Sequence, residues 1–170
     1  MRGPMAEIRL RHRARMREKD VKRMNETLMA DFGFDKAPFP AEAERAEATD
    51  HHDVILHGGR ILGLIVKEGD RAIPAVRALL ANKPPKRYVT VDMGAIKFVT
   101  NGADVMAPGI VEADPAIQPG DLVWIRDERN KQPLAVGEAL VPGTAMPRGP
   151  KGKAVKSLHF VGDLFWGFEA

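Results

Sequence analysis

The sequence contains no cysteine and a single serine, Ser157, among its 170 residues. Without thiols the chain can form no disulfide, no thiolate zinc site and no cysteine nucleophile. A serine triad is also excluded unless Ser157 is its nucleophile. Covalent catalysis and structural zinc binding are therefore poor starting hypotheses for this chain.

Long apolar runs are missing as well. No stretch approaches the roughly 18–20 apolar residues that a membrane span requires, and the arginine-rich N-terminus lacks the apolar segment of a secretory signal. Hydrophobic residues make up 44% and charged residues 29% of the sequence, which is typical of a folded globular protein. We expect a cytoplasmic protein without membrane contact, built from one domain or two small ones.

Motifs for phosphate and metal chemistry are absent. The sequence has neither GxxxxGK[ST] nor GxGxxG between a strand and a helix. His51, His52 and His57 are close in sequence, but adjacent residues of a strand point to opposite faces, so only one of the first two could share a metal with His57. Nothing assembles into a catalytic set. We expect no enzymatic activity, no cofactor and no metal.

Positive charge is concentrated at the N-terminus. Residues 1–23 hold nine Lys and Arg against three Asp and Glu, whereas the whole chain has a net charge of only +3. Within 8–17, arginine alternates strictly with other residues, which predicts a strand with five guanidiniums on one face: Arg9, Arg11, Arg13, Arg15 and Arg17. This face is either a solvated outer surface or a site for a polyanion, and the mutual repulsion of the charges slightly favours the polyanion.

The first half of the chain is predicted to mix strands and helices. Apolar residues at helical spacing predict a helix over 18–31 that ends at Gly33. Residues 42–48 suggest an edge strand, and the runs 53–57 and 60–67 flank Gly58-Gly59 as in a hairpin. A short helix is expected over 75–81. The prolines within 82–86 form a stiff connector, so we place a domain boundary there, between 1–83 and 84–170.

The second half is predicted to consist of short strands with glycine and proline turns, which favours a compact barrel. The string VTVDMGAIKFVTNGADVMAPGIV (89–111) predicts a strand, a helix of about two turns over 95–99, a stop at Asn101-Gly102 and extended chain beyond. Further strands are expected at 122–125, 134–141, 155–161 and 165–168. Core packing is expected for Ile96, Phe98, Val99, Leu158 and Phe160, and core or cap positions for Trp124 and Trp166. The fold class is α+β.

The string 89–111 resembles the opening of a PUA domain, a small RNA-binding module attached to pseudouridine synthases and archaeosine transglycosylases. The resemblance continues in order through Gly120-Asp121, 134–137, 152–154 and 159–166, so it covers most of 88–166. A short N-terminal domain before a C-terminal PUA domain resembles the archaeal proteins related to the malignant T-cell-amplified-sequence proteins. The resemblance implies a small mixed α/β domain followed by a PUA pseudo-barrel of short strands with one short helix.

In PUA domains RNA is held by the short helix, the glycine turn after it and a strand near the C-terminus. The resemblance carries this role to Lys97, Asn101, Gly102, Ala103, Met106, Pro108, Gly109, Lys153, Lys156 and His159. A glycine lets a phosphate approach the backbone, lysines attract phosphates, and an exposed apolar group can underlie an unstacked base. The arginines of 9–17 would form a secondary basic face.

The implied function is non-enzymatic RNA binding in translation. The expected partners are tRNA, at its acceptor or CCA end, or rRNA on the small ribosomal subunit, together with a translation initiation factor. The step would be initiation, re-initiation or recycling, and the protein is expected to be a monomer. Two alternatives stay open: an accessory RNA-binding protein for tRNA or rRNA modification, and an adaptor whose N-terminal domain docks a translation factor.

Overall fold

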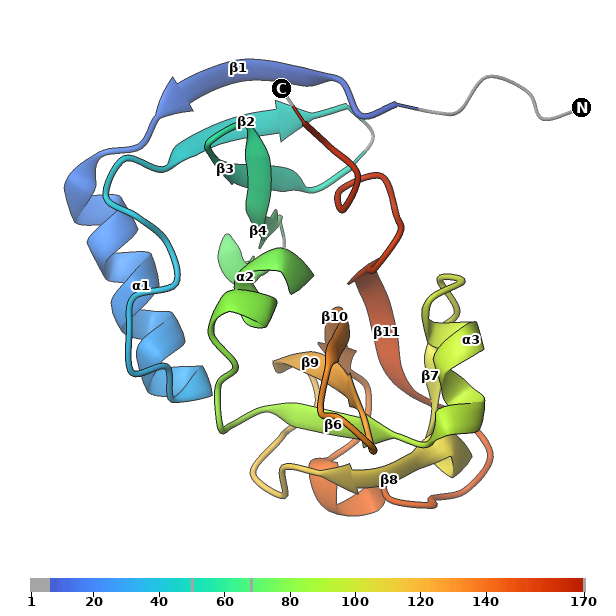
Figure 1. The fold of residues 1–170 in the computed structure, drawn as a ribbon. Coiled ribbons are helices and arrows are strands. Elements are labelled where there is room, and N and C mark those ends of the chain that lie inside the picture. Colours follow the sequence, from blue (N-terminus) through green and yellow to red (C-terminus); the bar gives the residue numbers. More distant parts are fainter. Residues whose placement is uncertain (1–6, 50, 68, 170) are drawn as a thin grey trace, which may run out of the picture.

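A computed structural model describes residues 7–49, 51–67 and 69–169 of the chain. Its strands form two sheets, one from each half of the sequence, which lie one above the other in Figure 1. Helix α1 runs down one side of the molecule, from the upper sheet towards the lower one. The α+β class predicted from the sequence is confirmed.

The N-terminal sheet has five strands in sequence order, all antiparallel. The strands are β1 (Leu10–Arg15), β2 (Glu44–Ala48), β3 (Asp53–His57), β4 (Arg60–Val66) and β5 (Arg71–Pro74). The predicted helix is α1 (Glu18–Phe32), which ends at Gly33 with a φ of 79°. Helix α2 (Val76–Ala81) follows the last strand. No helix in the described residues is long and apolar enough to cross a membrane.

For this half, one prediction was wrong and one strand was missed. The segment 42–48 was expected at a sheet edge, but β2 is bonded to β1 on one side and β3 on the other. β1 occupies the edge instead, because its arginines tolerate solvent on both faces. β5 was not predicted, since four residues between a turn and a helix show too little period to be recognised.

The C-terminal sheet has six strands in the order β7-β11-β10-β9-β6-β8 and curls into the PUA pseudo-barrel. They are β6 (Tyr88–Val91), β7 (Val105–Met106), β8 (Ile110–Ala113), β9 (Leu122–Asp127), β10 (Pro133–Ala139) and β11 (Lys153–Phe160). Only the β6–β9 pair is parallel among the strand pairs of the described residues. The short helix is α3 (Ile96–Val99), and 3-10 turns cover 93–95, 107–109 and 143–145.

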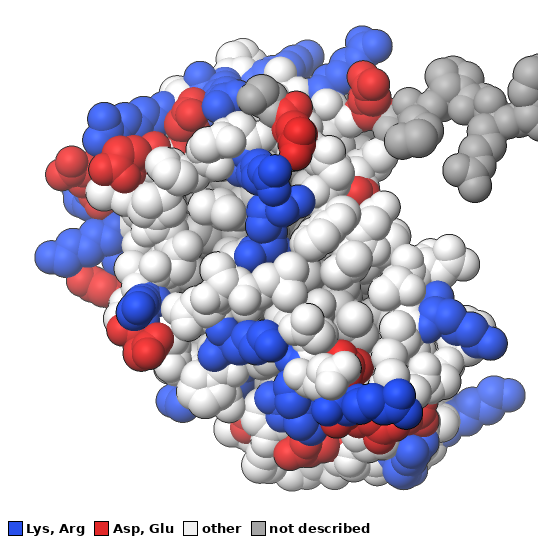
Figure 2. Space-filling model, in the orientation of Figure 1, with Lys and Arg blue, Asp and Glu red and all other residues white. Residues whose placement is uncertain are grey.

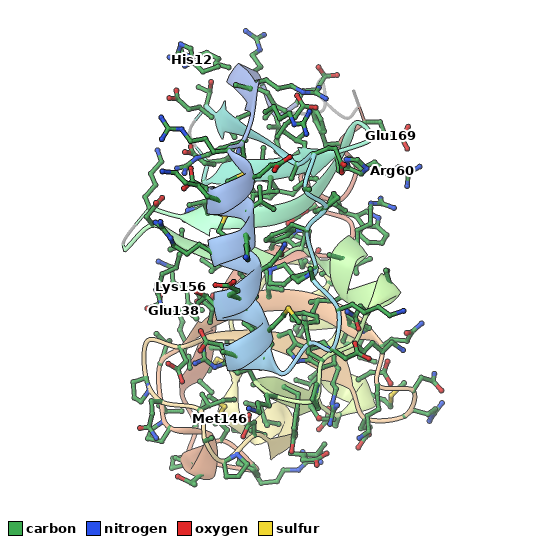
Figure 3. All side chains as sticks on the ribbon, turned by 90° about the vertical axis from the view of Figure 1, so that its left-hand side faces the viewer. His12, Arg60, Glu138, Met146, Lys156 and Glu169 are labelled. Carbon is green, nitrogen blue, oxygen red and sulfur yellow. The ribbon has the colours of Figure 1, made fainter. Side chains whose placement is uncertain are left out.

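The segment 165–168 was predicted as a strand, but it forms turns. After β11 the chain leaves the C-terminal sheet and crosses to the N-terminal one (Figure 1). Phe165 is buried there, and at the end of the segment Glu169 lies 3.0 Å from the guanidinium of Arg60. Figure 3 shows Arg60 and Glu169 together near the top of the molecule. The segment therefore fastens one sheet to the other.

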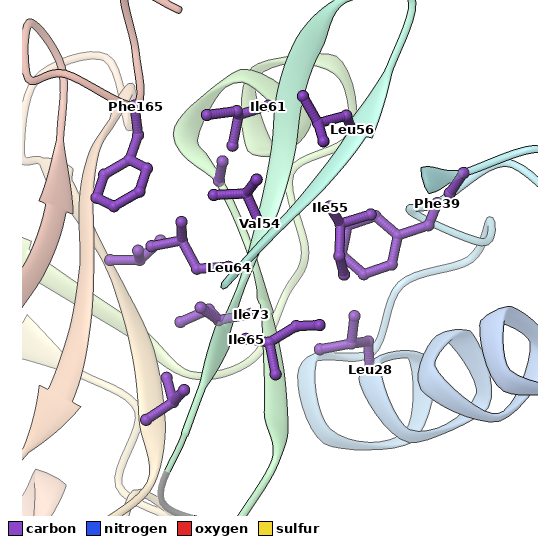
Figure 4. Close-up of a cluster of buried hydrophobic side chains, with 14 of the residues drawn as sticks. Leu28, Phe39, Val54, Ile55, Leu56, Ile61, Leu64, Ile65, Ile73 and Phe165 are labelled. Carbon is purple, nitrogen blue, oxygen red and sulfur yellow. The ribbon is translucent and has the colours of Figure 1, made fainter. Parts of the chain in front are cut away.

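Two hydrophobic clusters fill the interior. One lies within the pseudo-barrel and includes Val123 and Ile125 of β9. The other covers both faces of the N-terminal sheet, with Leu28 of α1 on one side and Phe165 of the C-terminal segment on the other (Figure 4). It also takes in Leu122 and Trp124 of β9. Figure 4 shows Phe165 beside the core residues of the N-terminal sheet. The second cluster is thus shared by the two halves of the chain.

We expect Phe165→Ala to lower the free energy of unfolding by about 3 kcal/mol, the usual cost of removing a buried aromatic ring. The matched control is Phe98→Ala, since Phe98 is 58% exposed and should cost at most about 0.5 kcal/mol. Urea denaturation followed by tryptophan fluorescence measures both variants. Equal losses in the two would show that the C-terminal segment contributes little to the shared core.

Candidate nucleic-acid interface

The segment around α3 is shaped by local hydrogen bonds. The Asp92 carboxylate accepts from the N–H of Ala95 at 2.9 Å, which caps the turn leading into α3. The N–H of Gly102 donates to the carbonyl of Val99, and the left-handed backbone of Gly102, with a φ of 91°, ends the helix. Chain direction then reverses into β7, so α3 and β7 stand beside each other. The helix and the Asn101-Gly102 stop were both predicted.

A groove of about 380 Å³ opens between α3 and β7. Its floor is made by the buried side chains of Val99 and Val105. Phe98 and Met106 form its exposed apolar walls, with 58% and 41% of their surface in contact with solvent. Such large exposed apolar side chains are costly to leave in water, and they commonly mark a binding surface. The remaining lining residues are Ala95, Ala103, Asp104 and Lys153.

Two lysines stand near these walls. The Lys97 ammonium lies 5.2 Å from the centre of the Phe98 ring, in cation–π contact with it. The Lys153 ammonium lies 3.2 Å from Asp104 and keeps 63% of its side chain exposed. Both charges can therefore meet an anion at the rim without being taken out of water.

Most of the residues that the family resemblance implicated gather around this groove. Ala103, Met106 and Lys153 line it, and Lys97 and Asn101 are exposed on the helix and turn beside it. Gly102 lies behind the turn, where an added Cβ would come within 2.9 Å of the Phe160 ring. It supports the groove through its backbone shape.

Pro108 and Gly109 lie one step further from the groove, in the 3-10 turn after β7. Pro108 is exposed, and its carbonyl accepts from the guanidinium of Arg148 at 2.8 Å. Gly109 packs so closely on Ala95 that an added Cβ would lie 3.2 Å from the Ala95 Cβ. The 3-10 turn 107–109 therefore packs against the 3-10 turn 93–95 that precedes α3, and Pro108 stays exposed to solvent.

Lys156 is exposed on β11, in register with Glu138 of β10, and the two lie side by side in Figure 3. It points away from the face that carries the buried Val155. Its charge still reaches Asp104 and helps to lower the pKa of that carboxyl. Lys156 is therefore near the groove but does not line it.

His159 does not belong to an exposed surface, and its predicted place in the interface was wrong. The residue is 1% exposed, and both ring nitrogens have protein partners. Nε2 accepts from the N–H of Val76 at the start of α2 at 3.1 Å. Because a backbone N–H only donates, Nδ1 carries the proton and donates to Asp163 at 2.8 Å. The imidazole joins β11 to the N-terminal half of the chain.

The predicted single face of five arginines is also wrong. β1 contains a bulge, with His12 at a φ of 54°, and the register against β2 shifts between Arg11 and Ala14. Before the bulge Arg11 pairs with Glu47, and after it Arg15 pairs with Glu44, which lies on the opposite face of β2. One extra residue reverses the alternation, so the arginines are divided between two faces.

The N-terminal arginines also differ in their ion pairs. Arg13 donates two hydrogen bonds to Glu44 at 2.8 and 3.0 Å, and Arg15 lies 3.9 Å from Glu18. In the described part of the chain Arg9, Arg11 and Arg17 have no carboxylate within 4.0 Å. Figure 2 shows Lys and Arg mixed with Asp and Glu over β1 and α1.

Sequence reasoning missed Phe98 as a surface residue. It was assigned to the core with its apolar neighbours, but α3 has only four residues and buries Val99 alone. A helix this short buries only one side chain fully. The shortness of the predicted helix could therefore have indicated that some of its apolar residues are exposed. Asp104 was missed too, because a carboxylate is not an obvious part of an RNA surface.

A larger hollow of about 850 Å³ lies between α1 and the N-terminal sheet. Five arginines and five acidic residues line it, so its walls carry no net charge at neutral pH. A neutral hollow gives a polyanion no electrostatic advantage over any other ligand. The charged lining of the smaller groove, Asp104 and Lys153, is balanced as well, but this groove differs in its apolar walls and in the exposed Lys97 beside it.

Comparison with protein families and known proteins identifies the family of the chain. The family model described as "PUA domain" matches residues 87–161. An uncharacterized protein of Methanocaldococcus jannaschii is 42% identical over 163 residues, which cover 95% of this chain and 99% of that protein. Translation machinery-associated protein 20 of Saccharomyces cerevisiae is 34% identical over 62% of this chain and 61% of its own length.

Two further matches extend the comparison. The malignant T-cell-amplified sequence 1 homolog of Drosophila melanogaster is 32% identical over 71% of this chain and 68% of its own length. The crystal structure of a hypothetical protein from Pyrococcus horikoshii superposes with a TM-score of 0.79 at 36% identity, covering 91% of this chain and 97% of that one. Both halves of the fold are therefore present in a solved structure.

The close approach of Gly102 to Phe160 can be tested by substitution. Gly102 and Gly120 have φ values of 91° and 92°, but the site of an added Cβ is open at Gly120. We expect Gly120→Ala to cost about 1 kcal/mol of stability from the left-handed backbone alone. Gly102→Ala should cost about 1 kcal/mol more because the methyl group meets the Phe160 ring. Equal losses in thermal unfolding would contradict the assigned contact.

Proposed function

Because the chain belongs to the PUA-domain family that includes the malignant T-cell-amplified sequence and translation machinery-associated 20 proteins, we propose that it is an RNA-binding protein of translation that acts by binding and not by catalysis. Its target is tRNA, at the acceptor or CCA end, or rRNA of the small ribosomal subunit. The step is initiation, re-initiation or recycling, in the cytoplasm, with the protein acting as a monomer.

The observation that carries this proposal is the groove between α3 and β7. Most of its lining is apolar, with Val99 and Val105 buried beneath the exposed Phe98 and Met106. An unstacked RNA base has an apolar face that gains free energy on such walls, about 1–3 kcal/mol per stacked base. The lysines at the rim supply the phosphate attraction that a base alone lacks.

This arrangement favours a single-stranded end or loop over a continuous duplex. In a duplex the bases are stacked inside and offer no free face, and the deep major groove of A-form RNA excludes side chains. The CCA end of a tRNA and the loops of rRNA both present unpaired bases. Three implicated residues lie near the groove but outside it: Asn101, Pro108 and Lys156. They would then contact the sugar-phosphate backbone of the bound RNA strand.

We propose that the two sheets mark two domains, 1–83 and 84–170, with the first docking a ribosomal or initiation-factor partner. Between β5 and β6 the chain passes from one sheet to the other through the proline-containing connector. In this arrangement Arg9, Arg11 and Arg17, which have no carboxylate within 4.0 Å in the described residues, form secondary contacts for phosphate on either side of the bulge.

Replacing both Lys97 and Lys156 by Gln tests the primary surface. If each contacts one phosphate, the slope of log affinity against log salt should fall by about 1.4 for single-stranded RNA. Fluorescence anisotropy with a labelled single-stranded RNA that ends in CCA, over a range of KCl concentrations, measures it. The control is Lys36→Gln with Lys83→Gln, exposed lysines in the loops after α1 and α2. A slope unchanged in the first pair, or changed equally in both, would refute the assigned surface.

Replacing Arg9, Arg11 and Arg17 by Gln tests the secondary contact. We expect the salt slope for intact tRNA or small-subunit rRNA to fall by about 2 to 3, because three phosphate contacts are lost. Point substitution is preferred to deletion of 1–17, since deletion would remove β1 from its sheet. An unchanged slope would leave these arginines a solvated edge.

The choice of RNA and pathway needs separate measurements. Binding to tRNA with and without its CCA end reports whether the acceptor terminus enters the groove. Sedimentation of the protein with small ribosomal subunits supports translation, whereas association with a modification enzyme alone would support an accessory role. Crosslinking in extract, followed by sequencing of the bound RNA, identifies the target directly.

A further inference from the structure

One residue of the groove does not match the general chemistry of an RNA surface. Asp104 lines the groove between α3 and β7, and 27% of its side chain is exposed. A carboxylate repels phosphates, so its presence among apolar walls and lysines weakens any purely electrostatic contact with RNA. Polar groups that are few and fixed in an apolar pocket usually set the orientation and identity of the ligand.

The Asp104 carboxylate is held in place from two sides. Oδ1 accepts from the backbone N–H of Ser157 on β11 at 2.9 Å, and Oδ2 lies 3.2 Å from the Lys153 ammonium. Since one partner is a strand backbone, the acceptor cannot drift with the loop that carries it. A group fixed before binding loses little entropy when a ligand arrives.

The carboxylate is also kept in one protonation state. Partial burial acts to raise the pKa of Asp104, but the Ser157 hydrogen bond and the charges of Lys153 and Lys156 outweigh it and lower the pKa below its usual value. At neutral pH the side chain therefore accepts hydrogen bonds and cannot donate. A carboxylate accepts about four hydrogen bonds, and two of them are occupied here.

We propose that Asp104 selects the base in the groove by accepting a hydrogen bond from an exocyclic amine, so that the groove prefers cytosine, adenine or guanine to uracil. This inference rests on the proposed RNA binding. Phe98 and Met106 would contact the face of any base and cannot distinguish one base from another. The carboxylate instead forms a hydrogen bond only with a base whose edge carries a donor. Uracil has no amine, and its only ring N–H donor lies between two carbonyl oxygens that the carboxylate would repel.

A fixed, partly buried acceptor discriminates against a ligand without the matching donor, because the lone pairs that face the groove then lose their water without gaining a hydrogen bond. One good amine–carboxylate contact discriminates between bases by about tenfold. All three bases of a CCA end carry an exocyclic amine. Asp104 would thus favour such an end over a uridine-rich one.

The test compares hexamers of cytidine and of uridine, which have equal length and charge and bases with the same single ring. Each hexamer contains a single type of base, so the same base enters the groove whichever nucleotide of the hexamer is bound there. A second pair, hexamers of adenosine and of purine riboside, differs only in the amine. Dissociation constants are measured for the full chain, for Asp104→Asn and for Asp35→Asn, a control that removes the same charge from an exposed loop.

Wild type and Asp35→Asn should bind the amine-bearing hexamers about tenfold more tightly. Asp104→Asn keeps an oxygen for the Ser157 N–H but adds an amide donor that suits uracil, so its preference should fall towards one. Two results would overturn this inference and leave the proposed function standing. One is equal dissociation constants of wild type for the two members of each pair, and the other is an unchanged ratio of these constants in Asp104→Asn. Wild type that binds no hexamer, nor tRNA or rRNA, would overturn the proposed function with it.

Discussion

Strand β9 is buried on both faces, and the architecture depends on that constraint. Val123 and Ile125 point into the pseudo-barrel, whereas Leu122 and Trp124 point into the core of the N-terminal sheet. The Trp124 indole N–H also donates to the carbonyl of Lys86 in the connector, at 2.9 Å. A strand covered on both faces reads as a continuous apolar run. The two sheets are consequently parts of one packed body.

The edge of the C-terminal sheet at β7 lies outside the shared core. β7 has only two residues and, among the described strands, pairs with β11 alone, which places it at the sheet edge beside the groove. Phe98 and Met106 contribute little to the core, while Val99 and Val105 beneath them are buried. Stability and recognition are thereby assigned to different side chains of the same short segment.

Two polar residues show how the tertiary environment decides a role. His159 and Asp104 both contact β11 or lie on it, and each has two protein partners. The histidine is enclosed and its hydrogen-bonding capacity is fully used, so it stabilises the fold. The carboxylate keeps free lone pairs at the wall of a groove, so it is available to a ligand. Residue type alone would have suggested the opposite assignment.

The sequence by itself determined the fold class, α1, the helix and turn of 95–102 and the PUA resemblance, because periodicity and glycine stops are local properties. The bulge at His12, the burial of His159 and the exposure of Phe98 came only from the tertiary structure. A one-residue shift in register reverses a strand face, and burial depends on elements distant in sequence. Long-range packing therefore decided which residues of a correctly recognised motif face the solvent.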